Sequence, residues 1–176
     1  MREILESKQA LEGLERIAGE MIARSDGGKS LALVGIRKGG VPVAEHLAKR
    51  ILERTGLQVP MGSVDITLYR DDGPEPLPMP HIGRSDVVFE VANLRIVLVD
   101  DVLMTGRTVR AALHALLDYG RPKAIELAVL VDRGGRELPI QPDYVVQRVN
   151  VSPTAHVEVL AEQGFRAVVQ DQPGSG

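Results

Sequence analysis

The sequence predicts an open, mostly parallel α/β sheet flanked by helices, built as a single domain over residues 1–176. Apolar runs of strand length alternate with segments of helical periodicity, the order that parallel strands and crossover helices require. Several runs, such as LALVGI at 31–36, are continuously apolar, which is typical of strands buried on both faces. No internal repeat or linker divides the chain, and its length suits one core.

The first part of the chain predicts two helices and two strands. Apolar side chains share one face in each helix, and Leu11 and Leu14 are among those of the first. The expected elements are a helix at 8–24, a turn at 25–30, a strand at 31–36, a helix after the RKGG segment and a strand at 64–69.

Residues 70–85, RDDGPEPLPMPHIGRS, predict a long loop, because four prolines and two glycines exclude regular structure. A loop of this length inside a compact domain is usually functional or disordered.

The rest of the chain continues the alternation. The helix with its apolar face on 109–117 stops at Gly120, with Pro122 beyond. The expected elements are a strand at 96–100, that helix, strands at 125–132 and 144–149, and a short hairpin over 156–170.

Composition excludes several classes of protein. No apolar run approaches the ~20 residues of a membrane span, and acidic residues interrupt the N-terminal segment where a signal peptide needs an apolar core. Zero cysteines exclude disulfides and fit a cytoplasmic protein. A net charge of -3 argues against a generally basic nucleic-acid-coating protein, and 3% aromatic residues argue against base-stacking platforms.

Two adjacent carboxylates, Asp100 and Asp101, follow the apolar strand at the carboxyl edge of the predicted sheet. Ligands of open α/β sheets bind at this edge. A single Asp is most simply a helix cap, but two neighbouring carboxylates repel each other and need hydrogen-bond donors or cations. Sugar hydroxyls supply donors and Mg²⁺ supplies charge.

The segment from Val102 to Thr108 is expected to open the next helix. Its main-chain N–H groups, the hydroxyls of Thr105 and Thr108, and the permissive backbone of Gly106 form a cradle for an anion. Carboxylates for a sugar diol beside a phosphate cradle predict a ribose 5-phosphate site.

Residues 97–109, VLVDDVLMTGRTV, resemble the phosphoribosyl pyrophosphate (PRPP) signature of type I phosphoribosyltransferases. Nearly the whole chain, and most densely 62–140, is similar to the pyrimidine operon regulator family of the PyrR type. The segments that carry this similarity are DITLYRDD at 65–72, the PRPP signature, and GRPKAIELAVLVDRGGRELPI at 120–140. The resemblance implies the type I phosphoribosyltransferase fold with a flexible hood loop at about 70–85.

That resemblance implies a uracil phosphoribosyltransferase, which converts uracil and PRPP to UMP and pyrophosphate with Mg²⁺. Asp100 and Asp101 are expected to hold the ribose hydroxyls and, partly through substrate, the Mg²⁺. The remaining PRPP-binding residues are expected to be Met104, Thr105, Gly106, Arg107 and Thr108.

Three further segments acquire roles from the same resemblance. Arg70 begins the hood loop, which closes over the reacting sugar and excludes water. Asp132 and Arg133 end the strand where type I enzymes read the base, usually through the main chain. The pyrophosphate loop is expected to comprise Arg37, Lys38, Gly39 and Gly40, although Lys38 alone fits a solvated turn equally well.

The identity of the base follows from a substitution. Hypoxanthine-guanine phosphoribosyltransferases have an Asp before the Thr-Gly pair that handles a purine ring proton, whereas this chain has Met104, which transfers no proton. Relatives in the PyrR family usually have Tyr there. The sequence thus favours uracil over a purine, with a phosphoribosyltransferase for another base as an alternative.

The resemblance also implies a regulatory role, because many members of the family bind pyrimidine leader RNA in response to UMP, and relatives form homodimers or homotetramers. Arg16, Arg136 and Arg148 are the candidate RNA-binding residues. Gly19, Gly135, Gln141 and Gln147 stand where relatives usually carry basic or hydrogen-bonding side chains. Because affinity falls with each phosphate left unneutralised, we expect weak or absent RNA binding. A UMP-sensing regulator with little catalysis is the other alternative.

Overall fold

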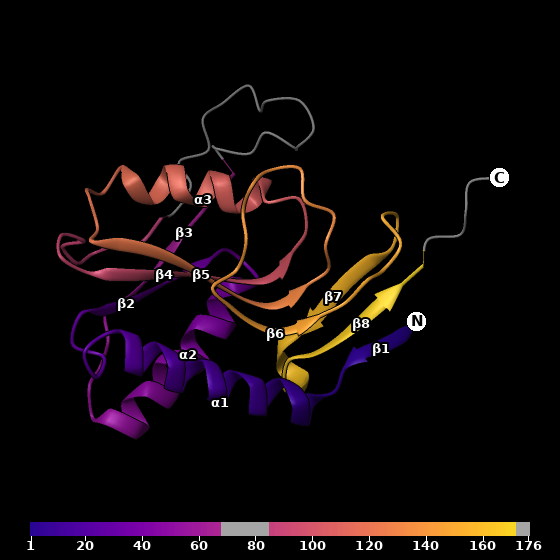
Figure 1. Cartoon of the computed structure of the whole chain (residues 1–176), viewed down its shortest axis with the longest axis horizontal. Coiled ribbons are helices and arrows are strands. Elements are labelled where there is room, and N and C mark those ends of the chain that lie inside the picture. Colours follow the sequence, from indigo (N-terminus) through magenta and orange to yellow (C-terminus); the bar gives the residue numbers. More distant parts are fainter. Residues whose placement is uncertain (68–84, 172–176) are drawn as a thin grey trace.

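A five-stranded parallel sheet forms the centre of the molecule in the computed structural model, which describes residues 1–67 and 85–171 (Figure 1). The strand order is β3-β2-β4-β5-β6. These strands are β2 (Leu31–Ile36), β3 (Met61–Val64), β4 (Arg95–Leu103), β5 (Ala124–Asp132) and β6 (Tyr144–Arg148). The predicted parallel α/β architecture is therefore confirmed.

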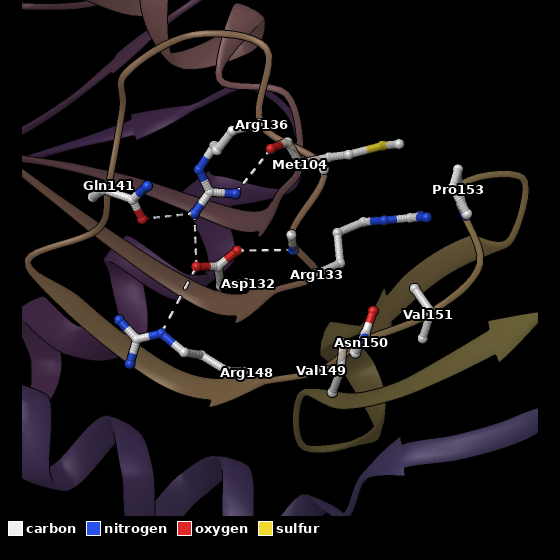
Figure 2. A pocket seen from close by; sticks show the side chains of 12 residues that line it. Met104, Asp132, Arg133, Arg136, Gln141, Arg148, Val149, Asn150, Val151 and Pro153 are labelled. Atoms are coloured by element: carbon white, nitrogen blue, oxygen red, sulfur yellow. Dashed lines mark hydrogen bonds and ion pairs between the residues drawn. The ribbon is translucent and has the colours of Figure 1, made fainter.

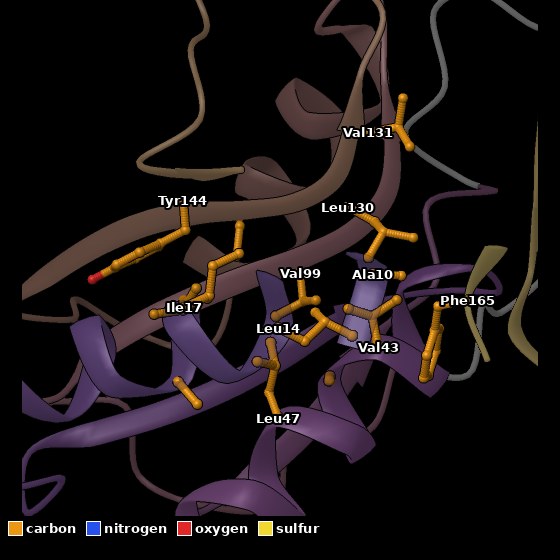
Figure 3. Packing of buried hydrophobic residues seen from close by; sticks show 14 of the residues in the cluster. Ala10, Leu14, Ile17, Val43, Leu47, Val99, Leu130, Val131, Tyr144 and Phe165 are labelled. Atoms are coloured by element: carbon orange, nitrogen blue, oxygen red, sulfur yellow. The ribbon is translucent and has the colours of Figure 1, made fainter. Parts of the chain in front are cut away.

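Helices cover both faces of this sheet. The α1 (Ser7–Arg24) and α2 (Gly40–Thr55) helices pack on one face, and α3 (Arg107–Leu117) packs on the other (Figure 1). Leu14 of α1 and Leu47 of α2 share one buried cluster with Val99 of β4 (Figure 3). Val109 of α3 belongs to the second cluster, which lies on the opposite face. Strands buried from both sides explain why their sequences are continuously apolar.

A second, smaller sheet joins the two ends of the described chain. It has the order β1-β8-β7, with β1 (Arg2–Leu5), β7 (His156–Leu160) and β8 (Arg166–Gln170) paired antiparallel. A single 3₁₀ turn, η1 (Ala161–Gln163), connects β7 and β8, which confirms the predicted C-terminal hairpin. The β1 strand was not predicted, because four residues at a sheet edge, of which only Leu5 is fully buried, carry little local pattern.

Several predicted boundaries are wrong. The strand expected at 64–69 ends at Val64 and begins at Met61, since Gly62 and Ser63 pair with β2 despite their weak strand propensity. The strand expected at 96–100 runs on to Leu103, and α3 begins at Arg107 rather than at Val102. Leu11, expected on the buried face of α1, is exposed, and Ala10 takes the buried position instead.

Candidate active site

Asp100 and Asp101 lie within the last part of β4, not beyond its end. Val102 and Leu103 continue the strand and pair with Val131 and Asp132 of β5. Because β4 and β5 stay paired in register up to these residues, the acidic pair and the end of β5 reach the same edge of the sheet. This places the predicted sugar residues beside the predicted base residues.

The two carboxylates have different surroundings. Asp100 is 6% exposed, and burial, followed by repulsion from Asp101, raises the pKa of its carboxyl well above the usual value. Its Oδ1 accepts a hydrogen bond of 2.9 Å from the Asp101 amide. Asp101 is half-buried, and its Oδ1 accepts a hydrogen bond of 2.8 Å from the Val102 amide. Neither carboxylate pairs with a cation within residues 1–67 and 85–171.

The loop between β2 and α2 packs directly against this pair. A side chain at Gly39 would overlap the Asp101 carboxylate, and one at Gly40 would overlap the main-chain oxygen of Val99. The absence of a Cβ therefore lets the start of α2 approach the end of β4. The predicted pyrophosphate loop and the acidic pair are brought together.

The preceding residues of this loop face outward. The Arg37–Lys38 peptide bond is cis, and both side chains are exposed. The Arg37 Nε donates a hydrogen bond of 3.0 Å to Ser63 Oγ at the end of β3. Lys38 stays available to an anion, and Ser63 is a contact that the sequence did not reveal.

The phosphate loop spans residues 104–108. Gly106 adopts a left-handed φ of 92°, which a residue with a side chain rarely adopts, and α3 begins at the next residue. The Thr105 hydroxyl accepts a hydrogen bond of 3.1 Å from the Arg107 amide. The helix start with its dipole lies where the sequence places the phosphate cradle, and binding of an anion there stays a prediction.

Residues 136–140 hold the phosphate loop from behind. The amides of Glu137 and Leu138 donate to the main-chain oxygen of Thr105 at 2.9 and 3.1 Å. Arg136 donates to the main-chain oxygen of Met104 at 2.8 Å, and Arg107 pairs with Glu137 at 3.2 Å. More than thirty positions separate some of these partners, so sequence reasoning missed the support.

A pocket of 490 Å³ lies between the phosphate loop and the end of β5 (Figure 2). Its walls come from Met104, from residues 132–136 and from residues 148–151, with Gln141 and Pro153 at its margin. Asp132 is a buried carboxylate 2.7 Å from Arg136 and 3.9 Å from Arg148. Burial would raise the pKa of Asp132, but the hydrogen bonds from Arg136 and the Gly134 amide outweigh it and lower the pKa.

Arg133 crosses this pocket wall. Its guanidinium donates to the main-chain oxygens of Ala155 at 2.7 Å and Ser152 at 2.9 Å. Its own amide donates to Leu103 at 3.0 Å. The predicted base residues thus connect the end of β4 to the loop after β6.

The candidate RNA residues do not form a freely exposed basic face. Arg136 is committed to Asp132, Met104, Ile140 and Gln141. Arg16 and Arg148 are exposed and line a second pocket of 550 Å³ between α1 and β6. Glu20 and Asp143 line the same pocket and balance their charge.

The predicted hood loop, with Arg70, falls on residues 70–85 and lies outside the described residues except for Ser85. In the described part of the chain, no three acidic or histidine side chains gather to hold a metal. None of the helices described there is long and apolar enough to cross a bilayer.

Residues 1–162 match the phosphoribosyl transferase domain family. The chain is 53% identical over 157 residues to a bifunctional protein PyrR of Deinococcus radiodurans, covering 89% of this chain and 84% of that protein. It is 49% identical over 161 residues to the PyrR of a Thermoanaerobacter species, covering 92% and 90% of the two chains. It is also 48% identical to the PyrR of Geobacter sulfurreducens, covering 93% and 92%.

Solved structures share the fold. A hypoxanthine phosphoribosyltransferase of Trypanosoma cruzi has a TM-score of 0.73 at 18% identity and covers 99% of this chain and 98% of its own. That of Staphylococcus aureus has a TM-score of 0.69 at 19% identity, covering 89% and 81%. These likenesses confirm the predicted type I phosphoribosyltransferase fold, and by family match and identity the chain belongs to the phosphoribosyl transferase domain family and, within it, to the PyrR family.

Proposed function

We propose that the protein is a uracil phosphoribosyltransferase, which joins uracil to the C1′ carbon of PRPP and releases pyrophosphate. The observation that carries this proposal is the uncompensated acidic pair beside the phosphate loop, with a pocket that ends at Met104. Carboxylates recognise the ribose diol, the loop recognises the 5-phosphate, and the pocket receives the base. Each group then stands next to the part of the substrate that its chemistry fits.

Magnesium fits this site as a partner of the substrate. Asp100 and Asp101 supply hard oxygen donors, and Mg²⁺ in such sites is bound by one or two carboxylates together with substrate oxygens. When bound, the ion offsets the charge of the leaving pyrophosphate. The main chain at Gly39 packs against Asp101, and the exposed Lys38 precedes it, so this loop can orient that leaving group.

The test is a product assay with PRPP, Mg²⁺ and a panel of bases. Because Met104 transfers no proton, we expect kcat/KM for uracil to exceed that for hypoxanthine and guanine by orders of magnitude, at least about a hundredfold. Equal use of guanine would overturn the choice of base. No nucleotide product with any base would leave a UMP-sensing regulator as the function.

RNA regulation is a second candidate, favoured by the name bifunctional protein that the relatives carry. We expect weak or absent binding to pyrimidine leader RNA, since Arg136 is committed internally and acidic side chains balance Arg16 and Arg148. A filter-binding titration with UMP checks this expectation. Nanomolar, UMP-enhanced binding would contradict it.

A cytoplasmic location and a homodimer or homotetramer complete the proposal. Zero cysteines are consistent with a reducing compartment. Light scattering coupled to size-exclusion chromatography measures the oligomer directly.

A further inference from the structure

Arg133 is the one arginine among the described residues whose side chain is buried. It is 7% exposed, yet none of the described carboxylates pairs with it. Arg136 and Arg148, in the same pocket, both pair with Asp132. The positive charge of Arg133 is therefore left without a counter-ion in a region of low dielectric.

The hydrogen bonds of Arg133 compensate only part of this burial. Two guanidinium nitrogens donate to the Ser152 and Ala155 oxygens, but the buried Nε has no acceptor. Burial lowers the pKa of the guanidinium, which means that the surroundings disfavour its charge. An unmade bond and an unpaired charge both cost stability, and the fold keeps both at the wall of a pocket.

A group that carries negative charge in this pocket would offset that cost. Apart from Asp132, the described residues that line the pocket offer such a group no proton acceptor: Met104 is a thioether, and residues 149–155 contain no titratable side chain. Asp132 is held by Arg136, Arg148 and the Gly134 amide, and these contacts make it a weak base. The charged groups facing Arg133 in the pocket are thus one neutralised carboxylate and two arginines.

We propose that the charge of Arg133 stabilises the uracil anion, so that the base enters the reaction already deprotonated. The inference rests on the proposed function. The N1–H bond breaks first, and its proton leaves to solvent. The N1 electron pair then forms the bond to C1′ while the C1′–O bond to pyrophosphate breaks, and pyrophosphate departs with that electron pair. No side chain has to accept the proton. The charge of Arg133 thus takes over the function of the Asp that handles a ring proton in the purine enzymes and that Met104 replaces here.

The first experiment measures kcat against pH for wild type, Arg133→Gln and Arg133→Lys, with uracil and with 5-fluorouracil, whose N1–H is more acidic. We expect Arg133→Gln to lose about tenfold in kcat on uracil at pH 7, equivalent to about one pKa unit of the bound base. The deficit shrinks as the pH rises and is smaller for 5-fluorouracil. Arg133→Lys, which keeps the charge, recovers part of the loss.

The matched control is Arg166→Gln, which removes a guanidinium that pairs with Glu3 between β8 and β1, outside the pocket. It should leave both pH profiles unchanged. If Arg133→Gln instead lost the same factor on both bases at every pH, Arg133 would only support the loop, and the inference would fall. Absence of wild-type turnover with uracil would overturn the proposed function itself.

A second measurement needs no variant and therefore does not depend on Arg133→Gln folding. A fluorine NMR titration of 5-fluorouracil, bound to the wild-type protein with ribose 5-phosphate, gives the pKa of the bound base. We expect this pKa to lie below that of the free base by about one unit. An unchanged or raised pKa would overturn the inference.

Discussion

Two buried carboxylates at opposite ends of the sheet differ in whether cations compensate their charge. Glu126, near the start of β5, lies 3.5 Å from Arg24 and 3.4 Å from Arg95, and the hydroxyl of Tyr144 donates to it at 3.2 Å. Asp100, near the end of β4, has another carboxylate as its neighbour and no cation within the described residues.

This difference is the one we expect between a structural charge and a charge of the proposed sugar site. Compensation by two arginines and a tyrosine makes Glu126 part of the packing, where its burial costs little. Asp100 carries the full cost of desolvation and repulsion, so its ionised form is destabilised until donors or a cation arrive. Substitutions of the acidic pair should accordingly change turnover, and substitutions of Glu126 and its partners should change the free energy of unfolding.

The largest expected effect is on turnover, from the double change Asp100→Asn and Asp101→Asn. Loss of both carboxylates removes the diol and metal contacts, and PRPP-dependent turnover should fall about a thousandfold or more. Circular dichroism should show an intact fold. Near-normal turnover would refute the assignment of the sugar site.

Asp100→Asn alone should also raise stability at neutral pH. Because the folded-state pKa of Asp100 lies above its unfolded value, the folded protein binds the extra proton between these two values. The free energy of unfolding of wild type therefore falls as pH rises from about 4 through the raised pKa, and the variant should lack this fall. Urea unfolding at several pH values measures the difference, and parallel curves for both proteins would contradict it.

Gly39→Ala should reduce turnover by about a hundredfold, because the new methyl group displaces the Asp101 carboxylate. Gly13→Ala is a matched control, since its methyl group overlaps Val146 at the packing of α1 on β6, away from the acidic pair. It should lower the melting temperature and leave kcat unchanged. Equal losses of turnover in both variants would show that the effect of Gly39 is only on stability.

Glu126→Gln should leave turnover unchanged and lower the free energy of unfolding by about 1–3 kcal/mol. The amide keeps the shape of the side chain but loses both arginine partners and weakens the acceptor for Tyr144. Denaturant unfolding beside a kinetic assay tests both halves. A loss of kcat with unchanged stability would remove the contrast with Asp100.

The smallest effect belongs to Tyr144→Phe and appears only at alkaline pH. Burial, followed by the charge of Glu126, raises the pKa of Tyr144 to about 12. The folded state then holds the phenol proton longer than the unfolded state, so the free energy of unfolding falls between about pH 10 and 12. The Phe variant should lack this alkaline fall in thermal unfolding scans, and an identical fall in both proteins would rule out Tyr144 as its source.

The sequence predicted those parts whose cause is local. The strand predicted at 31–36 has the same ends in the structure, because a continuous apolar run of this length bounded by turns indicates a strand buried on both faces. Asp100, Asp101 and the loop at Gly106 could be proposed as a site from the sequence because their side chains lie in adjacent residues.

What escaped prediction depends on distant pairing. The extension of β4 to Leu103 is stabilised by Val131 and Asp132, and β1 exists because Arg2 meets Val169. The packing of Gly39 on Asp101 and the hydrogen bond from Arg136 to Met104 join segments that no local pattern connects. The burial of the Arg133 side chain and its unpartnered Nε also depend on distant segments, and the sequence did not reveal them.

The shared register of β4 and β5 determines where this chain tolerates insertions and deletions. Asp100 lies opposite Val129 and Leu103 opposite Asp132, so the proposed sugar and base residues have fixed positions in one pair of hydrogen-bonded strands. Deleting one residue inside either strand would turn every following side chain to the other face and separate the two halves of the site. Length changes in the connection at 118–123 should cost far less, because loop closure depends only weakly on length. Homologous enzymes recombined by exchange of segments should therefore keep 95–132 as one block, with length variation confined to that connection.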